Sequence, residues 1–393
     1  MPYKRKIVNA IISRINEHRR FIQIVVGPRQ TGKTTAVSQA LAQFSLPYRS
    51  VEATYKESTA DWLRAQWQLA RNLITKDNHS ALLVVDEIQY IPNWSAVVKT
   101  LWDEDTRAGI DLRVLFTGSS ANLLLSGMTE SLMGRYEPIE SPHWTYQECK
   151  DAFDMPLEDF LYFGSYPGAI PLCADERRWV KYIKSSIVEP SISIDVSSLE
   201  EVRKPELMRR LFELGAPYSG QEISYRKLLG QLDDKGNTAT IAHYLTLLSQ
   251  AGLMSGLQKY DPKLLREKAS SPRLIVHNTA LMSAMYGRKR RLLRTDPSLH
   301  GRLVESAVGA YLINRAQTED FSVYWWREGN DEVDFVIACE DAVSAIEVKS
   351  GRVKPTTGMQ RFVLENPHVK EIVIGSFDYP LESFLLGEVE LFR

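Results

Sequence analysis

A glycine-rich segment near the start of the chain combines the residue types that hold phosphate groups. It reads Gly27-Pro28-Arg29-Gln30-Thr31-Gly32-Lys33-Thr34-Thr35 and contains the pattern G-x-x-x-x-G-K-[ST]. Glycine lets the backbone wrap close to a phosphate, and the N–H groups at a helix N-terminus point at it. Lys33 supplies a cation for the β- and γ-phosphates, and the Thr34 hydroxyl is a ligand for Mg²⁺. The segment predicts a P-loop that binds ATP with Mg²⁺; the alternative is a chance glycine-rich turn.

Two acidic residues, Asp86 and Glu87, end the apolar run Leu82–Val85. A buried strand would deliver the Asp86 carboxylate to the Mg²⁺ shell, and Glu87 would polarise the attacking water. The alternative for a lone Asp-Glu pair is a solvated strand end. At this separation from a P-loop, the pair predicts ATP hydrolysis, with ATP and ADP as ligands.

Two further positions have weaker catalytic signals. Ser119, or its neighbour Ser120, follows the apolar run Leu112–Phe116 and could sense the γ-phosphate or orient the water. It could equally cap a helix that begins at residue 121. Arg135 could be an arginine finger that reaches the nucleotide of a neighbouring subunit, although a single arginine is also typical of a surface salt bridge.

The series of motifs resembles that of a family of prokaryotic AAA-like ATPases whose C-terminal region was long catalogued as a domain of unknown function. The shared segments are Gly-Pro-Arg-Gln-x-Gly-Lys-Thr, Val-Asp-Glu-Ile-Gln, Phe-Thr-Gly-Ser-Ser and Met-Gly-Arg. Residues 160–167 also match the family's Tyr-Leu-x-x-Gly-Gly-x-Pro, with Ser165 in place of the second glycine. The resemblance covers nearly the whole chain. It implies an AAA-like ATPase core, a winged-helix middle and a C-terminal region similar to PD-(D/E)XK nucleases, and it implies no known substrate.

Acidic residues near the C-terminus form a second candidate site. Glu347 and Lys349 share one face of a strand because they are two residues apart, and Asp334 lies on the strand before it. Two carboxylates and an ammonium could hold Mg²⁺ or Mn²⁺ and generate a nucleophilic water for attack at a phosphodiester. Glu305, on the preceding helix, would complete the metal shell, as it does in families of this type. The alternative is a half-exposed edge strand, and folds of this type also persist as binding modules.

The middle of the chain has features of DNA-binding proteins. Residues 223–232 and 238–250 read as helix-turn-helix, followed by a turn-rich segment that could form a β-wing. Thr238, Thr240, His243 and Tyr244 begin the second helix, where a recognition helix would meet the groove. Residues 259–302 contain eleven Lys/Arg against three Asp/Glu, which indicates either DNA contact or a solvated loop. Many winged helices bind proteins instead, and His277-Asn278 stands where the family tends to show an Asp.

The elements that must position these residues follow from the pattern of apolar runs. Apolar strands alternate with helical stretches up to about residue 146, which predicts a parallel α/β sheet. The pattern is then mostly helical up to residue 291, and strands return after it. We expect an AAA-like P-loop domain at 1–146, a helical and winged-helix domain at 147–291, and a restriction-endonuclease-like α/β domain at 292–393.

Composition narrows the class of protein further. The 393 residues carry a net charge of −1, so any surface for nucleic acid must be local. The three cysteines are far apart and show no C-x-x-C spacing, which argues against a disulfide framework or a zinc site. The first thirty residues lack a continuous apolar core, and no later run is long enough to span a membrane. These features predict a reduced cytoplasmic protein with no membrane partner.

Two hypotheses from different classes account for these signals. The first is an oligomeric, Mg²⁺-dependent ATPase that acts on DNA through its winged helix and C-terminal nuclease-like site. The second is an ATP-gated regulatory or assembly switch that binds protein partners and has no nuclease activity. The joint presence of Glu305, Asp334, Glu347 and Lys349 favours the first.

Overall fold

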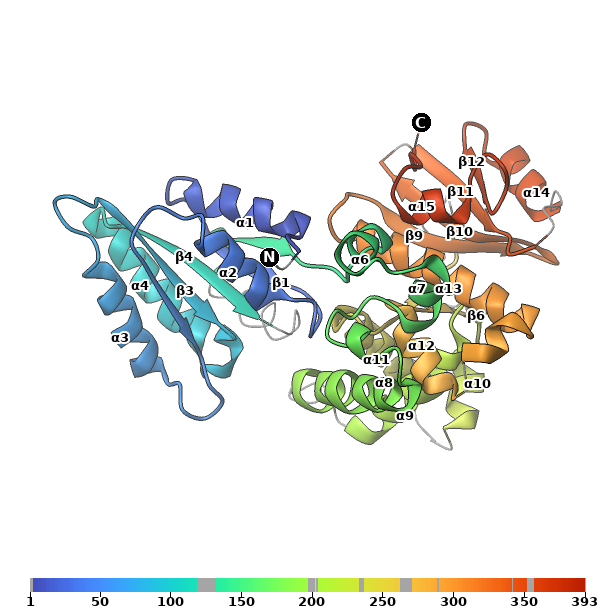
Figure 1. The fold of residues 1–393 in the computed structure, drawn as a ribbon, viewed down its shortest axis with the longest axis horizontal. Coiled ribbons are helices and arrows are strands. Elements are labelled where there is room, and N and C mark those ends of the chain that lie inside the picture. Colours follow the sequence, from blue (N-terminus) through green and yellow to red (C-terminus); the bar gives the residue numbers. More distant parts are fainter. Residues whose placement is uncertain are drawn as a thin grey trace. The chain divides into compact units, whose positions relative to one another are not determined.

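The chain divides after Ser141 in the computed structural model (Figure 1). The structure describes residues 3–118, 132–196, 202, 204–232, 237–261, 271–287, 290–340, 342–351 and 357–392. One unit is Met1–Ser141 and the other is Pro142–Arg393. Within the second unit, α13 (Pro297–Ala316) packs on elements that precede residue 291, including β8 (Arg273–Val276), and the expected domain boundary at 291 stays a prediction.

A parallel five-stranded sheet forms the centre of the first unit. Its strands lie in the order β2-β3-β4-β1-β5, and every neighbouring pair is parallel. The strands are β1 (Ile22–Val26), β2 (Tyr48–Glu52), β3 (Ser80–Asp86), β4 (Asp111–Gly118) and β5 (Tyr136–Glu140). The apolar runs in the sequence therefore predicted β1, β3 and β4 correctly, as well as the parallel α/β class.

Helices cover both faces of this sheet. On one face lie α1 (Lys6–Asn16) and α2 (Lys33–Leu41), whose apolar residues pack against Val25, Leu82 and Leu115. On the other face lie α3 (Ala60–Arg71) and α4 (Trp94–Ala108), which pack against the alternate residues of the same strands. Because both faces are covered, β1 is buried at all five positions. The carboxyl ends of β1 and β3 lie at one edge, where the P-loop and the acidic pair follow them.

The first half of the second unit is mainly helical around one large apolar core. Its helices are α6 (Tyr146–Phe153), α7 (Leu157–Phe163), α8 (Glu176–Tyr182), α9 (Pro205–Gly215), α10 (Tyr225–Gln231), α11 (Thr238–Gln250) and α12 (Thr279–Tyr286). A small antiparallel sheet in the order β6-β8-β7 accompanies them, with β6 at Gln221–Glu222 and β7 at Met254–Leu257. Two helices followed by an antiparallel strand pair are what a winged helix requires, and that assignment stays a prediction.

A four-stranded sheet in the order β12-β11-β10-β9 forms the second half of this unit. The strands are β9 (Ser322–Glu328), β10 (Asp331–Cys339), β11 (Ala342–Val348) and β12 (Lys370–Ile374). Residues of α13 pack on one face with α15 (Leu381–Leu385), and α14 (Thr357–Glu365) covers the other. Among the helices that the structure describes, none has the length and apolar character of a membrane-spanning segment.

Candidate functional sites

The P-loop follows the carboxyl end of β1 and packs closely against the backbone of Ser141. Gly27 has φ of 155°, and a Cβ there would lie 2.2 Å from the carbonyl oxygen of Ser141, so no larger residue fits. Gly32 has φ of 85° and immediately precedes α2. The N–H groups of the first turn of α2, which lack partners within the helix, therefore face the loop, and this arrangement binds a phosphate.

Lys33 folds over the carbonyl groups of this loop. Its ammonium donates to the carbonyl oxygens of Gly27, at 3.0 Å, and Pro28, at 2.6 Å. The side chain is 7% exposed. These carbonyl partners are neutral, so an anionic phosphate group entering the loop would be a stronger partner for the ammonium.

Asp86 connects the acidic strand end to the P-loop. The Thr34 hydroxyl donates to Asp86 Oδ2 at 2.8 Å, and the Thr117 hydroxyl donates to Oδ1. Burial raises the pKa of Asp86, and the hydrogen bond from Thr34 opposes that rise. A carboxylate beside a hydroxyl is a pair of hard oxygen ligands, so these two side chains fit Mg²⁺.

Glu87 has an unusual backbone conformation for its residue type. Its φ is 55°, in the left-handed region, and its N–H donates to Asp86 Oδ1 at 3.1 Å. The Gln89 amide donates to Glu87 Oε2. Gln89 and Thr117 were not predicted as site residues, although both lie within the motif segments Val-Asp-Glu-Ile-Gln and Phe-Thr-Gly-Ser-Ser.

Arg5 is a buried contact of the P-loop that the sequence analysis also missed. Its guanidinium donates to the carbonyl oxygen of Thr31 at 3.1 Å and to Ser141 Oγ at 3.5 Å, and the residue is 6% exposed. The Ser141 N–H donates to the carbonyl oxygen of Val26 at 2.7 Å. Arg5 and Ser141 therefore stabilise the backbone of the P-loop and of the end of β1 through these hydrogen bonds. No sequence signal separates Arg5 from the other basic residues around it.

Arg135 lies at the amino ends of the strands, whereas the P-loop of its own chain lies at their carboxyl ends. It directly precedes β5, which runs parallel to β1 from the pair Ile22 and Tyr136. Its guanidinium makes two hydrogen bonds to Asp103, at 2.8 and 3.1 Å, and these raise the pKa of Arg135. A contact with the nucleotide of the same chain is therefore excluded by position, and a role in a neighbouring subunit stays a prediction. Ser119 and Ser120 lie outside the described residues.

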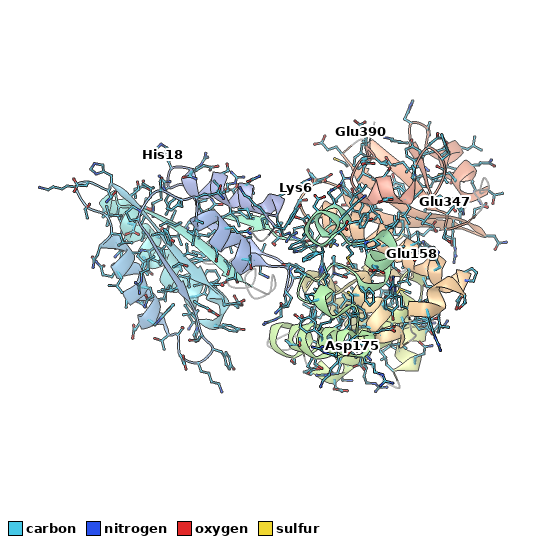
Figure 2. All side chains as sticks on the ribbon, in the orientation of Figure 1. Lys6, His18, Glu158, Asp175, Glu347 and Glu390 are labelled. Carbon is cyan, nitrogen blue, oxygen red and sulfur yellow. The ribbon has the colours of Figure 1, made fainter. Side chains whose placement is uncertain are left out.

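The predicted C-terminal residues come together in the second unit, where Figure 2 labels Glu347 of β11. Lys349 Nζ donates to Glu347 Oε1 at 2.5 Å, and Asp334 Oδ2 accepts the Val348 N–H at 2.8 Å. Asp334 lies where the pairing of β10 with β9 shifts register between Val333 and Val336. Such an irregularity re-aims side chains.

A residue absent from the sequence hypothesis joins these carboxylates. Arg273 of β8 donates from Nη1 to Glu305 Oε1 at 2.9 Å and to Asp334 Oδ1 at 3.2 Å. It also donates from Nη2 to Glu332 Oε1 at 3.2 Å. Burial alone would lower the pKa of Arg273, but the three carboxylates outweigh it and the pKa is raised. We call the set Glu305, Glu332, Asp334 and Glu347 the carboxylate cluster.

Glu305, Asp334 and Glu347, the metal ligands predicted for the second unit, are not placed to coordinate a metal ion. Within the ranges that the structure describes, no three His, Cys, Asp or Glu side chains are arranged to hold one. The physical reason is that the Arg273 guanidinium binds Glu305 and Asp334, where the sequence analysis expected a metal. Burial, and then the Asp334 carboxylate, raises the pKa of both Glu305 and Glu347.

Some of the residues proposed for DNA contact have other roles. Tyr244 is 1% exposed, and its hydroxyl accepts the Lys204 N–H at 3.0 Å, so it belongs to the core and not to a DNA-facing surface. Within the basic stretch, Arg273 is buried in the carboxylate cluster, and Arg290 pairs with Asp159. Thr238, Thr240 and His243 are half-buried.

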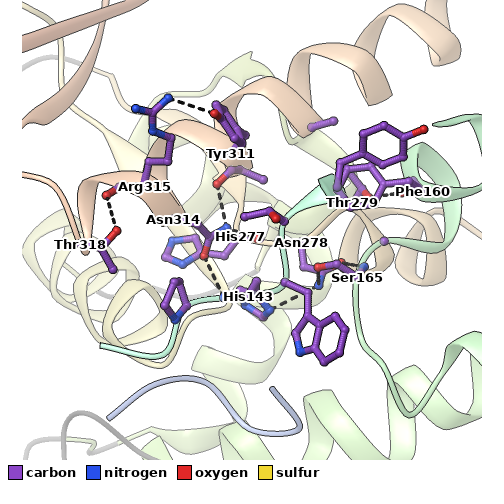
Figure 3. A pocket seen from close by; sticks show the side chains of 17 residues that line it. His143, Phe160, Ser165, His277, Asn278, Thr279, Tyr311, Asn314, Arg315 and Thr318 are labelled. Carbon is purple, nitrogen blue, oxygen red and sulfur yellow. Dashed lines mark hydrogen bonds between the residues drawn. The ribbon is translucent and has the colours of Figure 1, made fainter. Parts of the chain in front are cut away.

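Ser165 and Asn278, which depart from the family pattern, lie beside a small cavity of the second unit (Figure 3). Residues of the second unit enclose about 80 Å³, with His143, Ser165 and Asn278 among them. Asn278 Nδ2 donates to Ser165 Oγ at 2.9 Å and to His143 Nδ1 at 3.3 Å, and its Oδ1 accepts the Ser165 N–H at 3.2 Å. Burial, and then His143, lowers the pKa of His277 to about 3, so this ring is neutral. Ser165 and Asn278 are therefore partners of one another.

Three family models match successive parts of the chain. Residues 19–150 match an AAA domain, while 155–292 and 300–383 match two domains of unknown function. The first match confirms the AAA-like P-loop domain that the motifs predicted. The other two leave the winged-helix and nuclease-like assignments as predictions.

The relatives with long alignments are described as uncharacterized proteins. A protein of Mycobacterium tuberculosis is 25% identical over 381 residues, covering 94% of this chain and 80% of the relative. One of Haemophilus influenzae is 23% identical over 348 residues, covering 84% of this chain and 82% of its own length. Among solved structures, a Walker-type ATPase of Pyrococcus abyssi aligns with a TM-score of 0.45 at 12% identity, covering 73% of this chain and 98% of that one.

Proposed function

We propose that the first unit binds Mg²⁺-ATP in its P-loop and hydrolyses it. The observation that supports this most directly is the 2.8 Å hydrogen bond between Thr34 and Asp86, which joins the loop to the acidic strand end. Lys33 lies on neutral carbonyl groups of the same loop. Together these residues form a cation for phosphate next to a pair of oxygen ligands for Mg²⁺.

Each residue has one task in this reaction. The N–H groups of the loop and the Lys33 ammonium bind the phosphates and orient the terminal one. Thr34 and Asp86 would hold Mg²⁺, which supplies charge neutralisation on the phosphate oxygens. Glu87 accepts a hydrogen bond from Gln89, and its carboxylate would orient the attacking water and accept its proton.

A steady-state ATPase assay tests this proposal. Lys33→Ala should abolish turnover because it removes the cation that binds the phosphates. Lys76→Ala is the matched control, since Lys76 is an exposed lysine of the same unit, in the connection between α3 and β3. Turnover of the Lys33 variant at the wild-type rate would refute the assignment.

We also propose that the protein works as a homo-oligomer in which Arg135 acts on a neighbouring subunit. Arg135 lies at the amino end of β5, whereas its own P-loop follows the carboxyl end of β1. Asp103 holds its guanidinium in one orientation. Arg135→Ala should then lower turnover with little change in nucleotide affinity. Mixing that variant with Lys33→Ala should restore part of the activity, because each supplies what the other lacks.

For the second unit we propose DNA binding through α10, α11 and the basic stretch. Its support is the excess of eleven Lys/Arg over three Asp/Glu in residues 259–302, reduced by the arginines bound within the fold. DNA affinity that falls steeply with salt, and DNA-stimulated ATP hydrolysis, are the expected results. Absence of both would favour the alternative of an ATP-gated switch that binds protein partners.

Cleavage of DNA, if it occurs, depends on the residues around Glu347 in the C-terminal region. Convergence of Asp334, Glu347 and Lys349 favours phosphodiester cleavage, whereas Arg273 within the carboxylate cluster favours the switch. Glu347→Ala should remove any cleavage of duplex, single-stranded or branched DNA in Mg²⁺ or Mn²⁺ while sparing ATP hydrolysis. If the wild-type protein cuts none of these substrates, the switch is the better description.

A further inference from the structure

The carboxylate cluster already contains a cation, and that cation belongs to a different part of the second unit. Arg273 comes from β8 of the small sheet, whereas its partners come from α13 and β10. It is 3% exposed and makes charge-assisted hydrogen bonds to three carboxylates. Such bonds are about twice as strong as neutral ones. The guanidinium is therefore built into the cluster and does not rest on its surface.

Neighbouring groups fix the position of this guanidinium. Nη1 also donates to the main-chain oxygen of Asp334 at 3.1 Å, and the group lies 5.7 Å from the centre of the Trp325 ring. Glu332 is shared with Arg327, which also pairs with Glu222 of β6 at 2.5 Å. These contacts hold the Arg273 side chain of β8 between α13 and β10.

One buried carboxylate oxygen of the cluster accepts no hydrogen bond from the residues that the structure describes. Glu347 Oε2 is buried and has no hydrogen-bond partner within the described part of the chain, while Oε1 accepts from Lys349. A buried carboxylate oxygen without a partner carries a desolvation cost that an added cation would relieve. The chemistry of the cluster thus suits a divalent ion, but its geometry excludes one while Arg273 is present.

We propose that Arg273 is an internal replacement for a divalent cation, and that the carboxylate cluster binds such an ion only when Arg273 is withdrawn. The second unit is then closed to metal in the conformation described here. A shift of β8 that removes the guanidinium would leave Glu305, Asp334 and Glu347 free to become ligands for Mg²⁺ or Mn²⁺. This proposal does not depend on ATP hydrolysis by the first unit.

Counting bound Mn²⁺ on the full chain tests the proposal. Free Mn²⁺ is measured by electron paramagnetic resonance without nucleotide, in an Asp86→Asn background that removes the carboxylate of the P-loop unit. With Arg273 intact, we expect Glu347→Gln to leave the number of bound ions unchanged. Arg273→Met should add one ion per chain, and Glu347→Gln in that variant should remove it.

A double variant controls for misfolding of Arg273→Met. Arg273→Met with Glu332→Gln removes one carboxylate along with the guanidinium, so less uncompensated charge remains, and it should also gain one ion. Arg327→Met with Glu332→Gln is the matched control, because it removes the neighbouring arginine, and it should gain none. Loss of an ion on Glu347→Gln with Arg273 intact would overturn the proposal. So would a folded Arg273→Met/Glu332→Gln chain that gains no ion.

Discussion

The P-loop and the carboxylate cluster each contain a buried cation, but the two cations have different partners. Lys33 lies on two neutral carbonyl groups, at 3.0 and 2.6 Å. Arg273 lies on three carboxylates, at 2.9, 3.2 and 3.2 Å. A neutral carbonyl is a weaker partner for a cation than a carboxylate or a phosphate. A phosphate entering the loop would therefore be a stronger partner for Lys33 than these carbonyls, whereas Arg273 already has anionic partners.

The acidic residues of the two regions differ in the same way. Asp86 accepts from the hydroxyls of Thr34 and Thr117 and from the Glu87 N–H, and these neutral donors leave its charge available to a metal ion. Asp334 accepts from a guanidinium and a main-chain N–H. Convergence of carboxylates therefore does not by itself make a metal site, because the charge of their partners decides what else can bind.

The largest expected effect is on the chemistry at the P-loop. Glu87→Gln keeps the shape of the side chain but removes the group that accepts the proton of water. We expect kcat to fall by about 10²- to 10⁴-fold, with nucleotide affinity preserved. Rapid-quench measurement of ATP cleavage, together with a binding titration, separates the two. A variant with wild-type kcat would show that another group is the base.

The free energy of unfolding should fall more when Arg273 is removed than when Lys33 is removed. Arg273→Ala leaves buried carboxylates without a counter-charge, and we expect it to lower the free energy of unfolding by about 3–5 kcal/mol. Lys33→Ala removes hydrogen bonds to two neutral carbonyl groups and should cost about 1 kcal/mol or less. Urea denaturation of both variants makes the measurement. Equal losses in the two variants would remove the basis of the comparison.

A smaller effect is expected at the cavity of the second unit. His143 Nε2 lies 2.9 Å from the carbonyl oxygen of Gly252, so Nε2 carries the proton and Nδ1 accepts from Asn278. Asn278→Asp would place a carboxylate against that lone pair, and we expect a loss of about 1–3 kcal/mol in unfolding free energy. Asn278→Asp with Ser165→Gly should recover none of it, since His143 causes the loss. Thermal denaturation of the single and double variants checks this, and a neutral single variant would contradict it.

The smallest expected effect is a pH dependence at the end of β5. Burial raises the pKa of Glu140 to about 7 from its usual 4.5, so the folded state favours the protonated acid. Its contribution to stability is complete below pH about 4.5 and is lost as the pH rises through about 7. Glu140→Gln mimics the protonated form, so the stability of the wild type should fall relative to this variant over that range. Parallel pH profiles of Tm would contradict the expectation.

The sequence predicted best where one local segment contains both the structural and the chemical signal. Lys33 and Thr34 lie in a loop whose glycines and flanking apolar strand define its conformation. The strands β3 and β4 were readable as apolar runs because a parallel sheet covered on both faces buries every position. The pairing of Asp86 with Thr34 followed from these local features.

The sequence failed where a partner comes from a distant element. Arg273 lies 61 positions from Asp334, and nothing in the segment Arg273–Val276 shows that its arginine points into a cluster of acids. Arg5 was equally hidden, because a basic residue at the start of an amphipathic helix is typical of a surface. Tyr244 was assigned to a surface by its helix position, but tertiary packing buries it.

The most direct test of the central claim is a binding titration with a non-hydrolysable ATP analogue and Mg²⁺. The wild-type chain and Lys76→Ala should each bind one nucleotide per chain with the same affinity. Lys33→Ala should bind at least about tenfold more weakly, since a charge-assisted contact is lost. No binding by the wild type, or equal affinity in the Lys33 variant, would contradict the claim that this loop is a nucleotide site.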